Sequence, residues 1–201
     1  MSVEEAKRRL RRAMQAQRRA VGGAQRAAAG AAVAQRILAA PEFAAARRVA
    51  LYVALPDELP TDALLRAVLG SQRPLLLPRT EHHGGLDFAA VRDLGELVRG
   101  RFGALEPAAD APAERLADGD LVLLPGVAFD RRGGRLGRGL GGYDRALAAG
   151  GQALVSIGLG FAFQLVEAVP CAAHDRRVDA VATELELVRA VSARDRAADP
   201  G

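Results

Sequence analysis

The chain has 201 residues, of which 50% are hydrophobic and 26% are charged. These proportions are typical of a single globular domain and exclude a largely disordered chain. No run approaches the ~18 consecutive apolar residues that a membrane span requires, and no apolar core of a secretory signal is visible near the N-terminus. With one cysteine, Cys171, the chain is expected to be cytoplasmic, without an internal disulfide and without a membrane partner.

The net charge of +4 and the isoelectric point of about 10.1 would suit a polyanionic partner such as nucleic acid. However, Lys7 is the only lysine, so that 27 of the 28 basic residues are arginine, which keeps its charge to very high pH and raises the isoelectric point. Aromatic residues make up only 4% of the chain, too few for a base-stacking platform. We therefore expect a small-molecule partner and no nucleic acid, and we expect a monomer.

The hydrophobic pattern predicts helices that alternate with strands. A first helix, whose apolar face would be Val3, Ala6, Leu10 and Met14, should end at Gly22. Further helices are expected over residues 24–40, 62–69 with Thr61 as N-cap, and 143–149. Strands are expected over residues 49–54, 75–77, 86–91, 121–124, 153–157 and 178–181, with residues 100–118 forming a surface connection.

This alternation predicts an α/β fold with a mostly parallel central sheet. Neither a repeat nor a break in composition divides the chain, so a single domain is expected over residues 1–188. Residues 189–201 are polar and are expected to form a disordered tail.

The most informative segment is the glycine-rich stretch 133–142, in which six of ten residues are glycine and Arg135 and Arg138 lie between them. Glycine lets several backbone N–H groups approach one point, and a helix that begins near Tyr143 would add its positive end. This combination suits a phosphate group, and the alternative is a flexible surface loop.

Two common nucleotide motifs do not fit this segment. Gly137, Gly139 and Gly142 spell the dinucleotide-binding pattern, but it comes late in the chain and no acidic residue follows about 20 positions later. The phosphate loop of nucleoside triphosphatases is excluded because the segment contains no lysine.

Several acidic and basic residues have open interpretations. Asp144 could hold Mg²⁺ against a bound phosphate or could cap a helix. Asp175 and Asp179 could be metal ligands or turn formers. Lys7 and Arg11 share one helical face and could contact phosphate or form a solvated stripe.

The remaining reactive side chains carry weaker signals. His82 and His83 are interpreted as surface residues because no third zinc ligand lies nearby in the sequence. Cys171 and His174 are three residues apart, but a nucleophilic pair is the minor alternative.

Several segments of the chain together resemble a known family. Leu124-Pro125-Gly126, followed by Asp130, the glycine-rich stretch and Tyr143-Asp144, is similar to the signature of the 5-formyltetrahydrofolate cyclo-ligases, also called methenyltetrahydrofolate synthetases. The segments 6–11, 57–61, 77–79, 102–107 and 164–184 resemble further family elements in the same order. The resemblance extends over residues 4–186.

The resemblance implies a single three-layer α/β/α domain and the ATP- and Mg²⁺-dependent conversion of 5-formyltetrahydrofolate to 5,10-methenyltetrahydrofolate, with release of ADP and phosphate through an N5-iminium phosphate. By position, Arg138 and Tyr143 would be catalytic, and Asp144 and Asp175 would hold Mg²⁺. The implied ATP-binding residues are Lys7, Arg11, Arg135, Leu136, Gly137, Arg138, Gly139, Leu140, Gly141, Gly142 and Tyr143. The implied folate-binding residues are Val53, Glu58, Arg138, Gly139, Leu140, Gly141 and Gly142.

The chain departs from the family pattern at two positions. Leu140 stands where a small or cationic residue is usual, and Gly142 stands where the family has a tyrosine. Backbone N–H groups survive both changes, whereas a ring that could pack on the ligand is lost. The alternative expectation is therefore a family member that binds nucleotide and folate with little or no turnover.

Overall fold

The computed structural model describes residues 2–80, 85–100, 103–172 and 175–190. The helices are α1 (Val3–Ala20), α2 (Gly23–Leu38), α3 (Pro41–Ala45), α4 (Asp62–Gly70) and α5 (Gly142–Ala149), with 3-10 turns η1 (Leu94–Glu96) and η2 (Ala162–Gln164). The large sheet contains, in spatial order, β13 (Leu187–Arg189), β12 (Ala180–Ala182), β10 (Val155–Leu159), β7 (Asp120–Pro125), β1 (Arg48–Ala50), β2 (Leu75–Thr80), β3 (Leu86–Val91) and β6 (Ala113–Glu114). Two smaller sheets contain β11 (Leu165–Val166), β8 (Ala128–Asp130) and β9 (Arg135–Leu136), and β4 (Val98–Arg99) and β5 (Leu105–Glu106).

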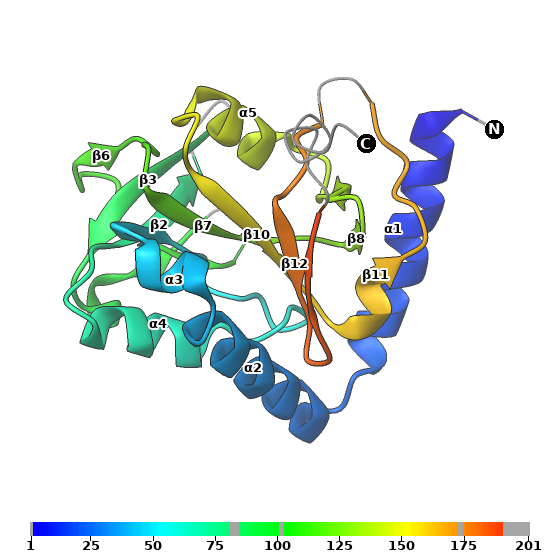
Figure 1. Cartoon of the computed structure of the whole chain (residues 1–201), viewed down its shortest axis with the longest axis horizontal. Coiled ribbons are helices and arrows are strands. Elements are labelled where there is room, and N and C mark those ends of the chain that lie inside the picture. The colour runs from blue at the N-terminus through cyan, green and yellow to red at the C-terminus, as the bar shows by residue number, and fades with distance from the viewer. Residues whose placement is uncertain (1, 81–84, 101–102, 173–174, 191–201) are drawn as a thin grey trace, which may run out of the picture.

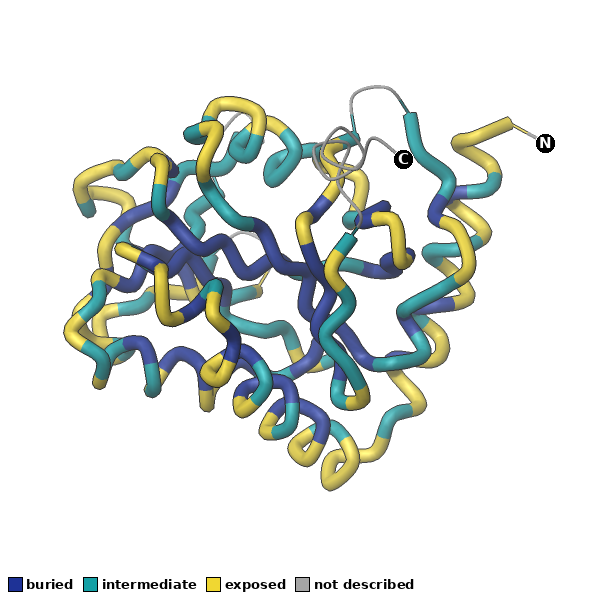
Figure 2. The backbone as a smooth tube through the Cα atoms, in the orientation of Figure 1, coloured by how far each residue is buried: buried dark blue, intermediate teal, exposed yellow. Residues whose placement is uncertain are grey.

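The centre of the large sheet is parallel, as the sequence predicts. Strands β12, β10, β7, β1 and β2 run in one direction, whereas β13 at one edge and β3 and β6 at the other are antiparallel to their neighbours. Val49 of β1 lies opposite Leu75 on one side and Leu121 on the other. These central strands form the largest buried part of the chain (Figure 2), because helices cover both of their faces, and this explains the nearly continuous apolar run of β7.

Helices lie on both faces of the sheet, and the sheet with its two helical coverings forms three layers (Figure 1). Val49 and Leu121 point into a core shared with α2, α3 and α4. Their neighbours Ala50 and Val122 point to the opposite face, where they pack with Tyr143 and other residues of α5. This alternation follows from the two-residue period of a strand. The predicted α/β fold with three layers is confirmed, and the small sheet β11-β8-β9 extends the layer on the α5 side.

The buried face of α1 differs from the predicted apolar stripe. The buried residues of α1 are Lys7, Met14 and Arg18, whereas Val3 is 47% exposed. These positions also lie on one helical face, because spacings of seven and four residues return to the same side of a helix. The prediction is confirmed at Met14, which is buried, and at Leu10, which packs against the same cluster, but not at Val3. The inner face also carries two cations because the helix packs partly against charged loops.

Two element boundaries move for identifiable reasons. The strand predicted over residues 49–54 ends at Ala50, and β2 continues through Pro78 to Thr80. Because the pairing of β2 with β1 stops at Leu76, Pro78 needs no N–H donor on that side. Thr61 does occupy the N-cap position of α4, but its hydroxyl donates to the Tyr52 carbonyl oxygen at 2.7 Å and does not cap the helix.

The connection predicted over residues 100–118 contains the short strands β5 and β6, and the glycine-rich stretch begins with a buried hairpin that includes β9. The last two predicted strands are observed two residues later, as β10 and β12. Strand β13 extends to Arg189, one residue beyond the expected domain end. Most of the predicted tail, residues 191–201, lies outside the described residues.

Candidate active site

A cavity of about 590 Å³ opens where the parallel strands β1, β2 and β7 end. Tyr52, Thr80 and Gly126, which lie at or just after the carboxyl ends of these strands, all line it. From β1 the chain continues to its neighbour β2 on one side of the sheet. The neighbour of β1 on the other side is β7, and from there the chain continues away from β1 to β10, so that the strand order reverses between β1 and β7. Open α/β sheets bind ligands at such a switch point.

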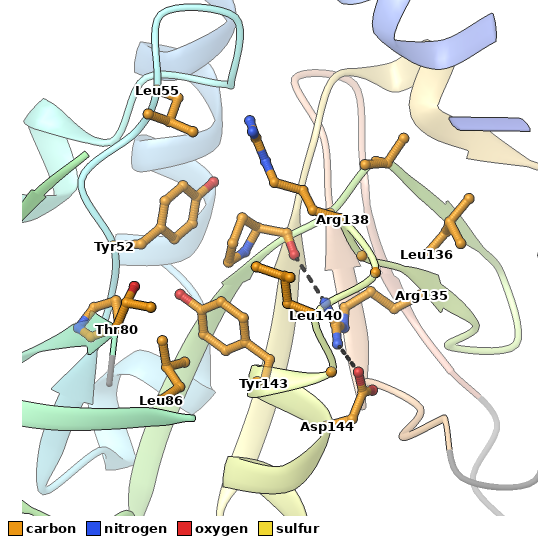
Figure 3. Close-up of a pocket in the computed structure, with 18 of the residues that line it drawn as sticks. Tyr52, Leu55, Thr80, Leu86, Arg135, Leu136, Arg138, Leu140, Tyr143 and Asp144 are labelled. Atoms are coloured by element: carbon orange, nitrogen blue, oxygen red, sulfur yellow. Dashed lines mark hydrogen bonds and ion pairs between the residues drawn. The ribbon is translucent and has the colours of Figure 1, made fainter. Parts of the chain in front are cut away.

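The structure brings every residue that the family resemblance assigned to the site to this one cavity, part of which is shown in Figure 3. They come from α1, from the loop between β1 and α4, from the glycine-rich stretch with the start of α5, and from the segment before β12. The predicted residues that line the cavity are Lys7, Arg11, Val53, Glu58, Arg135, Leu136, Gly137, Arg138, Gly139, Leu140, Gly141, Gly142, Tyr143, Asp144 and Asp175.

Helix α1 contributes two cations to the cavity wall. Lys7 is 4% exposed, and its Nζ atom lies 2.6 Å from a carboxylate oxygen of Asp175. One turn later, Arg11 donates from Nε to the carbonyl oxygen of Gly137 at 2.9 Å. The only lysine of the chain is thus buried in an ion pair, and Arg11 holds the glycine-rich loop against the helix.

The glycine-rich loop, residues 137–141, follows β9 and leads into α5. Gly139 and Gly141 have φ values of +101° and +66°, a conformation that glycine adopts without steric cost. Gly141 is the N-cap of α5 and supplies no side-chain bond, so the first N–H groups of the helix are not capped by a side chain. Leu140 is 53% exposed. Leu136, by contrast, is 2% exposed and packs against Met14 and Val127, although it also borders the cavity.

Arg135 is a buried cation at the base of the cavity. Its Nη2 atom lies 3.0 Å from Asp144, its Nη1 donates to the Pro125 carbonyl oxygen at 3.4 Å, and its guanidinium lies 5.7 Å from the centre of the Tyr143 ring. Among the described residues, nothing accepts a hydrogen bond from its Nε atom. A buried N–H donor without a partner is uncommon in folded proteins.

The loop between β1 and α4, residues 51–61, is called the acidic loop here and carries Glu58, the residue expected to bind the pterin. Glu58 is buried, and one of its carboxylate oxygens lies 3.0 Å from Nη2 of Arg138. Its other oxygen accepts a hydrogen bond from the Leu55 N–H at 3.0 Å. Arg138 therefore spans the cavity from the glycine-rich loop to the acidic loop.

Two tyrosines face the cavity, and both are neutral at physiological pH. Burial, with the nearby negative charge of Glu58, raises the pKa of Tyr143 far above its usual value. Burial and the same carboxylate also raise the pKa of Tyr52. Each phenol can therefore donate a hydrogen bond but cannot act as a base.

The sequence did not predict five polar residues that line the cavity, which are Glu4, Gln15, Tyr52, Thr80 and Glu106. Glu106 accepts hydrogen bonds from the N–H and the hydroxyl of Thr80 at 3.1 and 2.9 Å. Tyr52 could have been found, because the chain contains only two tyrosines and the other one lies in the glycine-rich signature. Glu106 lies in the segment 102–107, which resembles a family element, whereas no local pattern marks Thr80.

Some candidate residues have structural roles outside the cavity. Asp130 accepts hydrogen bonds from the N–H groups of Arg132, Gly134 and Val169 at 2.8–2.9 Å and thereby holds the hairpin before the loop. Asp179 accepts hydrogen bonds from the N–H and the hydroxyl of Ser156.

The weaker nucleophile and metal candidates do not join the cavity wall. Burial raises the pKa of the Cys171 thiol, which donates to the Val169 carbonyl oxygen. His82, His83 and His174 lie outside the described residues. In the described part of the chain, no cluster of three or more His, Cys, Asp or Glu side chains could hold a metal by itself.

None of the described helices has both the length and the apolar character that crossing a bilayer demands.

Comparisons with known proteins agree with the fold and with the signature. The 5-formyltetrahydrofolate cyclo-ligase family matches residues 3–184. The chain is 27% identical to the 5-formyltetrahydrofolate cyclo-ligase of Mus musculus, over 92% of this chain and 96% of that one. It is 34% identical to the Escherichia coli K12 enzyme of the same name, over 75% of this chain and 85% of that one.

A solved structure is also similar. The 5,10-methenyltetrahydrofolate synthetase of Aquifex aeolicus superposes with a TM-score of 0.81 at 31% identity, and the match covers 94% of each chain. Because the family match extends over nearly the whole chain and the fold agrees with it, the protein belongs to the 5-formyltetrahydrofolate cyclo-ligase family.

Proposed function

We propose that the protein converts 5-formyltetrahydrofolate to 5,10-methenyltetrahydrofolate and uses ATP and Mg²⁺, releasing ADP and phosphate. The relatives named above support the reaction, and the chemistry of the cavity supports the cosubstrate. The observation that carries the proposal is the meeting of Lys7, Glu58, Asp144 and Asp175 with the glycine-rich loop in one cavity.

The phosphates of ATP would lie between α1 and the glycine-rich loop. Lys7 and Arg11 are on one side of this space, and Arg135 and Arg138 are on the other. The unpartnered Nε of Arg135 and the N–H groups at the start of α5 are suitable donors to an anion. Gly139 and Gly141 would let the backbone approach these phosphates closely.

The residues present fit Mg²⁺ bound together with phosphate. Asp144 and Asp175 both line the cavity, and each is now paired with a cation, Arg135 or Lys7. Phosphate oxygens that bind these cations would release the carboxylates, which could then ligate the metal. Mg²⁺ usually binds through one or two carboxylates with substrate phosphates, so two carboxylates are sufficient. The metal would neutralise charge on the phosphates during phosphoryl transfer.

The pterin would bind on the opposite side, beside the acidic loop. The carboxylate of Glu58 suits the amino group and ring N–H of the pterin, which are both donors. Val53 and Tyr52 would provide the apolar wall. Leu140, exposed at the tip of the glycine-rich loop, would add an apolar contact where the family has a small or cationic residue.

The formyl oxygen is amide-like and is a poor leaving group, so its phosphorylation would activate the carbon for attack by N10. Transfer of the phosphoryl group to this oxygen gives an N5-iminium phosphate and ADP. Attack by N10 on the carbon then forms the new C–N bond, and expulsion of phosphate with loss of the N10 proton to solvent gives the methenyl product. Arg138 lies between the two halves of the cavity and would stabilise negative charge at the transferring group. Tyr143, a neutral phenol, would act as a hydrogen-bond donor.

The test is an assay in which purified protein receives ATP, Mg²⁺ and 5-formyltetrahydrofolate. The methenyl product is followed by its near-ultraviolet absorbance, and ADP by a coupled assay. We expect ADP and methenyl product in equal amounts, and ADP release only when the folate is present. Asp144→Asn should lower turnover by about a hundredfold, since a metal-binding carboxylate becomes a neutral amide. Asp110→Asn is the matched control, because Asp110 is exposed and outside the cavity.

The alternative is a protein that binds both ligands without turnover because of Leu140 and Gly142. Calorimetric titration separates the two hypotheses. Binding of nucleotide and folate by well-folded protein that forms no methenyl product would support the alternative. Absence of binding to either ligand would exclude both.

A further inference from the structure

Arg18, in the last turns of α1, is an unusual residue in the core. Its side chain is 1% exposed, and it is the largest side chain among the fully buried ones. Arginine is almost never completely buried unless its charge is paired. Neither the glycine-rich signature nor the cavity wall includes Arg18.

The guanidinium of Arg18, which does not line the cavity, binds the acidic loop. Its Nε donates to the Asp57 carbonyl oxygen at 3.0 Å, and its Nη2 donates to the Asp57 carboxylate in a short ion pair. The same Nη2 lies 4.0 Å from the Glu58 carboxylate. Its Nη1 donates to the Gly126 carbonyl oxygen at 3.4 Å, at the end of β7. One side chain thus joins three parts of the fold that surround the cavity.

The acidic loop needs this support because no neighbouring strand pairs with it beyond Leu51, whose N–H donates to the Leu76 carbonyl oxygen of β2 at 2.9 Å. Between Ala50 and Asp62 the chain forms no strand, and the Glu58 N–H bonds only locally, to the Leu55 carbonyl oxygen at 2.8 Å. Arg26 of α2 donates to the Glu58 carbonyl oxygen at 3.1 Å and to the Arg18 carbonyl oxygen at 2.7 Å. Arginine side chains therefore take the place of a strand partner for this loop.

Two arginines contact the two carboxylates of the acidic loop, and their side chains differ in exposure to solvent. Arg18 is buried, whereas the side chain of Arg138 is 43% exposed and reaches across the cavity from the glycine-rich loop. Arg138 lies 3.0 Å from Glu58 and 3.5 Å from Asp57. Because Arg18 neutralises Asp57, the more exposed Arg138 is directed to Glu58 and to whatever enters the cavity.

We propose that Arg18 is a positioning residue for the folate side of the site. It holds the acidic loop so that the Glu58 carboxylate faces the cavity, and it keeps Asp57 from competing for Arg138. This inference rests on the proposed function. Its specific consequence is that loss of Arg18 impairs folate binding more than nucleotide binding, because Lys7 and Arg11 are held by separate contacts with Asp175 and Gly137.

The test compares Arg18→Met and Arg18→Lys with the wild type by steady-state kinetics and thermal unfolding. Arg18→Met should raise the KM for 5-formyltetrahydrofolate by about tenfold or more, the effect of losing one charge-assisted hydrogen bond, with the KM for ATP changed by less than about threefold. Arg18→Lys should recover part of the folate KM, since the charge returns without the fork. Asp57→Asn should also raise the folate KM, and this variant tests the proposal if Arg18→Met does not fold.

Arg48→Met is the matched control. Arg48 also forms ion pairs, with Asp120 at 2.6 Å and Glu114 at 3.1 Å, but it lies at the amino end of the central strand β1, whereas the cavity opens at the carboxyl end. Its loss should lower the unfolding temperature and leave both KM values unchanged. An unchanged folate KM in folded Arg18→Met, an unchanged folate KM in Asp57→Asn, or a parallel rise in both KM values would overturn the inference while the wild type remains active. An inactive wild type that binds no folate would instead refute the proposed function, and the inference with it.

Discussion

The guanidinium of Arg138 lies 3.0 Å from the carboxylate of Glu58, although 80 positions separate the two residues in the chain. Arg138 belongs to the loop that would hold nucleotide, and Glu58 to the loop that would hold the pterin. The ion pair joins the two loops across the cavity, and it occupies the carboxylate that we propose for the pterin. On this proposal, binding of both substrates would exchange this contact for contacts with ligand.

Glu58→Gln tests the carboxylate side of this exchange. The amide keeps the size of the side chain but loses the charge that strengthens hydrogen bonds to the pterin, so binding of 5-formyltetrahydrofolate should weaken by about tenfold to a hundredfold. Calorimetric titration measures it, with exposed Glu96→Gln as the control. Wild-type affinity in Glu58→Gln would show that the pterin binds elsewhere.

Lys7→Arg tests whether the only lysine of the chain is required as such. Lys7 is 4% exposed and forms its ion pair with Asp175 at 2.6 Å, so a longer, planar guanidinium cannot occupy the same place without moving its neighbours. The KM for ATP should rise by about tenfold, whereas the folate KM should change little. Arg8→Lys, on the exposed side of α1, is the control. An unchanged KM for ATP in Lys7→Arg would argue against phosphate contact at this position.

The ion pair of Asp57 predicts how the free energy of unfolding depends on pH. Burial by itself would raise the pKa of Asp57, but the charge and hydrogen bond of Arg18, with the charge of Arg138, outweigh burial and hold the pKa below its ordinary value. A carboxyl group whose pKa is lower in the folded state stabilises the fold above its unfolded pKa, near 4, and loses this contribution as the pH falls through the folded value. The wild type should therefore exceed Asp57→Asn in unfolding free energy at pH 7, and the difference should shrink below pH 4. Urea unfolding at several pH values measures it, and a difference independent of pH would contradict the assignment.

Gly142 gives a prediction about the missing tyrosine. A Cβ atom at this position would lie 3.3 Å from Cβ of Leu86 on β3, closer than ordinary packing. The Cβ atom of Leu86 cannot rotate away, so Gly142→Tyr should destabilise the fold by about 1–3 kcal/mol, as overpacking does. In Gly142→Tyr combined with Leu86→Gly, which removes that Cβ atom, the cost should be smaller than the sum of the two single changes. Thermal or urea unfolding of the four proteins measures this coupling, and additive effects would show that the two positions are independent.

Much of the fold could be predicted because strand and helix periods are local. The apolar run of β7 and the alternation of segments were enough to predict a parallel sheet covered by helices. The glycine-rich stretch could be assigned to the cavity because its composition is unusual over only ten residues. By contrast, the predicted apolar face of α1 is confirmed only at Leu10 and Met14, since its inner side also meets carboxylates from distant loops.

By itself, the amino-acid sequence determined the layers, the family and many of the residues that line one cavity. Only the tertiary structure decided which charge faces which: Lys7 with Asp175, Arg135 with Asp144, Arg138 with Glu58, and Arg18 with Asp57. The reason is that backbone periodicity depends on neighbours along the chain, whereas these ion pairs join segments 9 to 168 positions apart, and the packing of the sheet and helices brings them together.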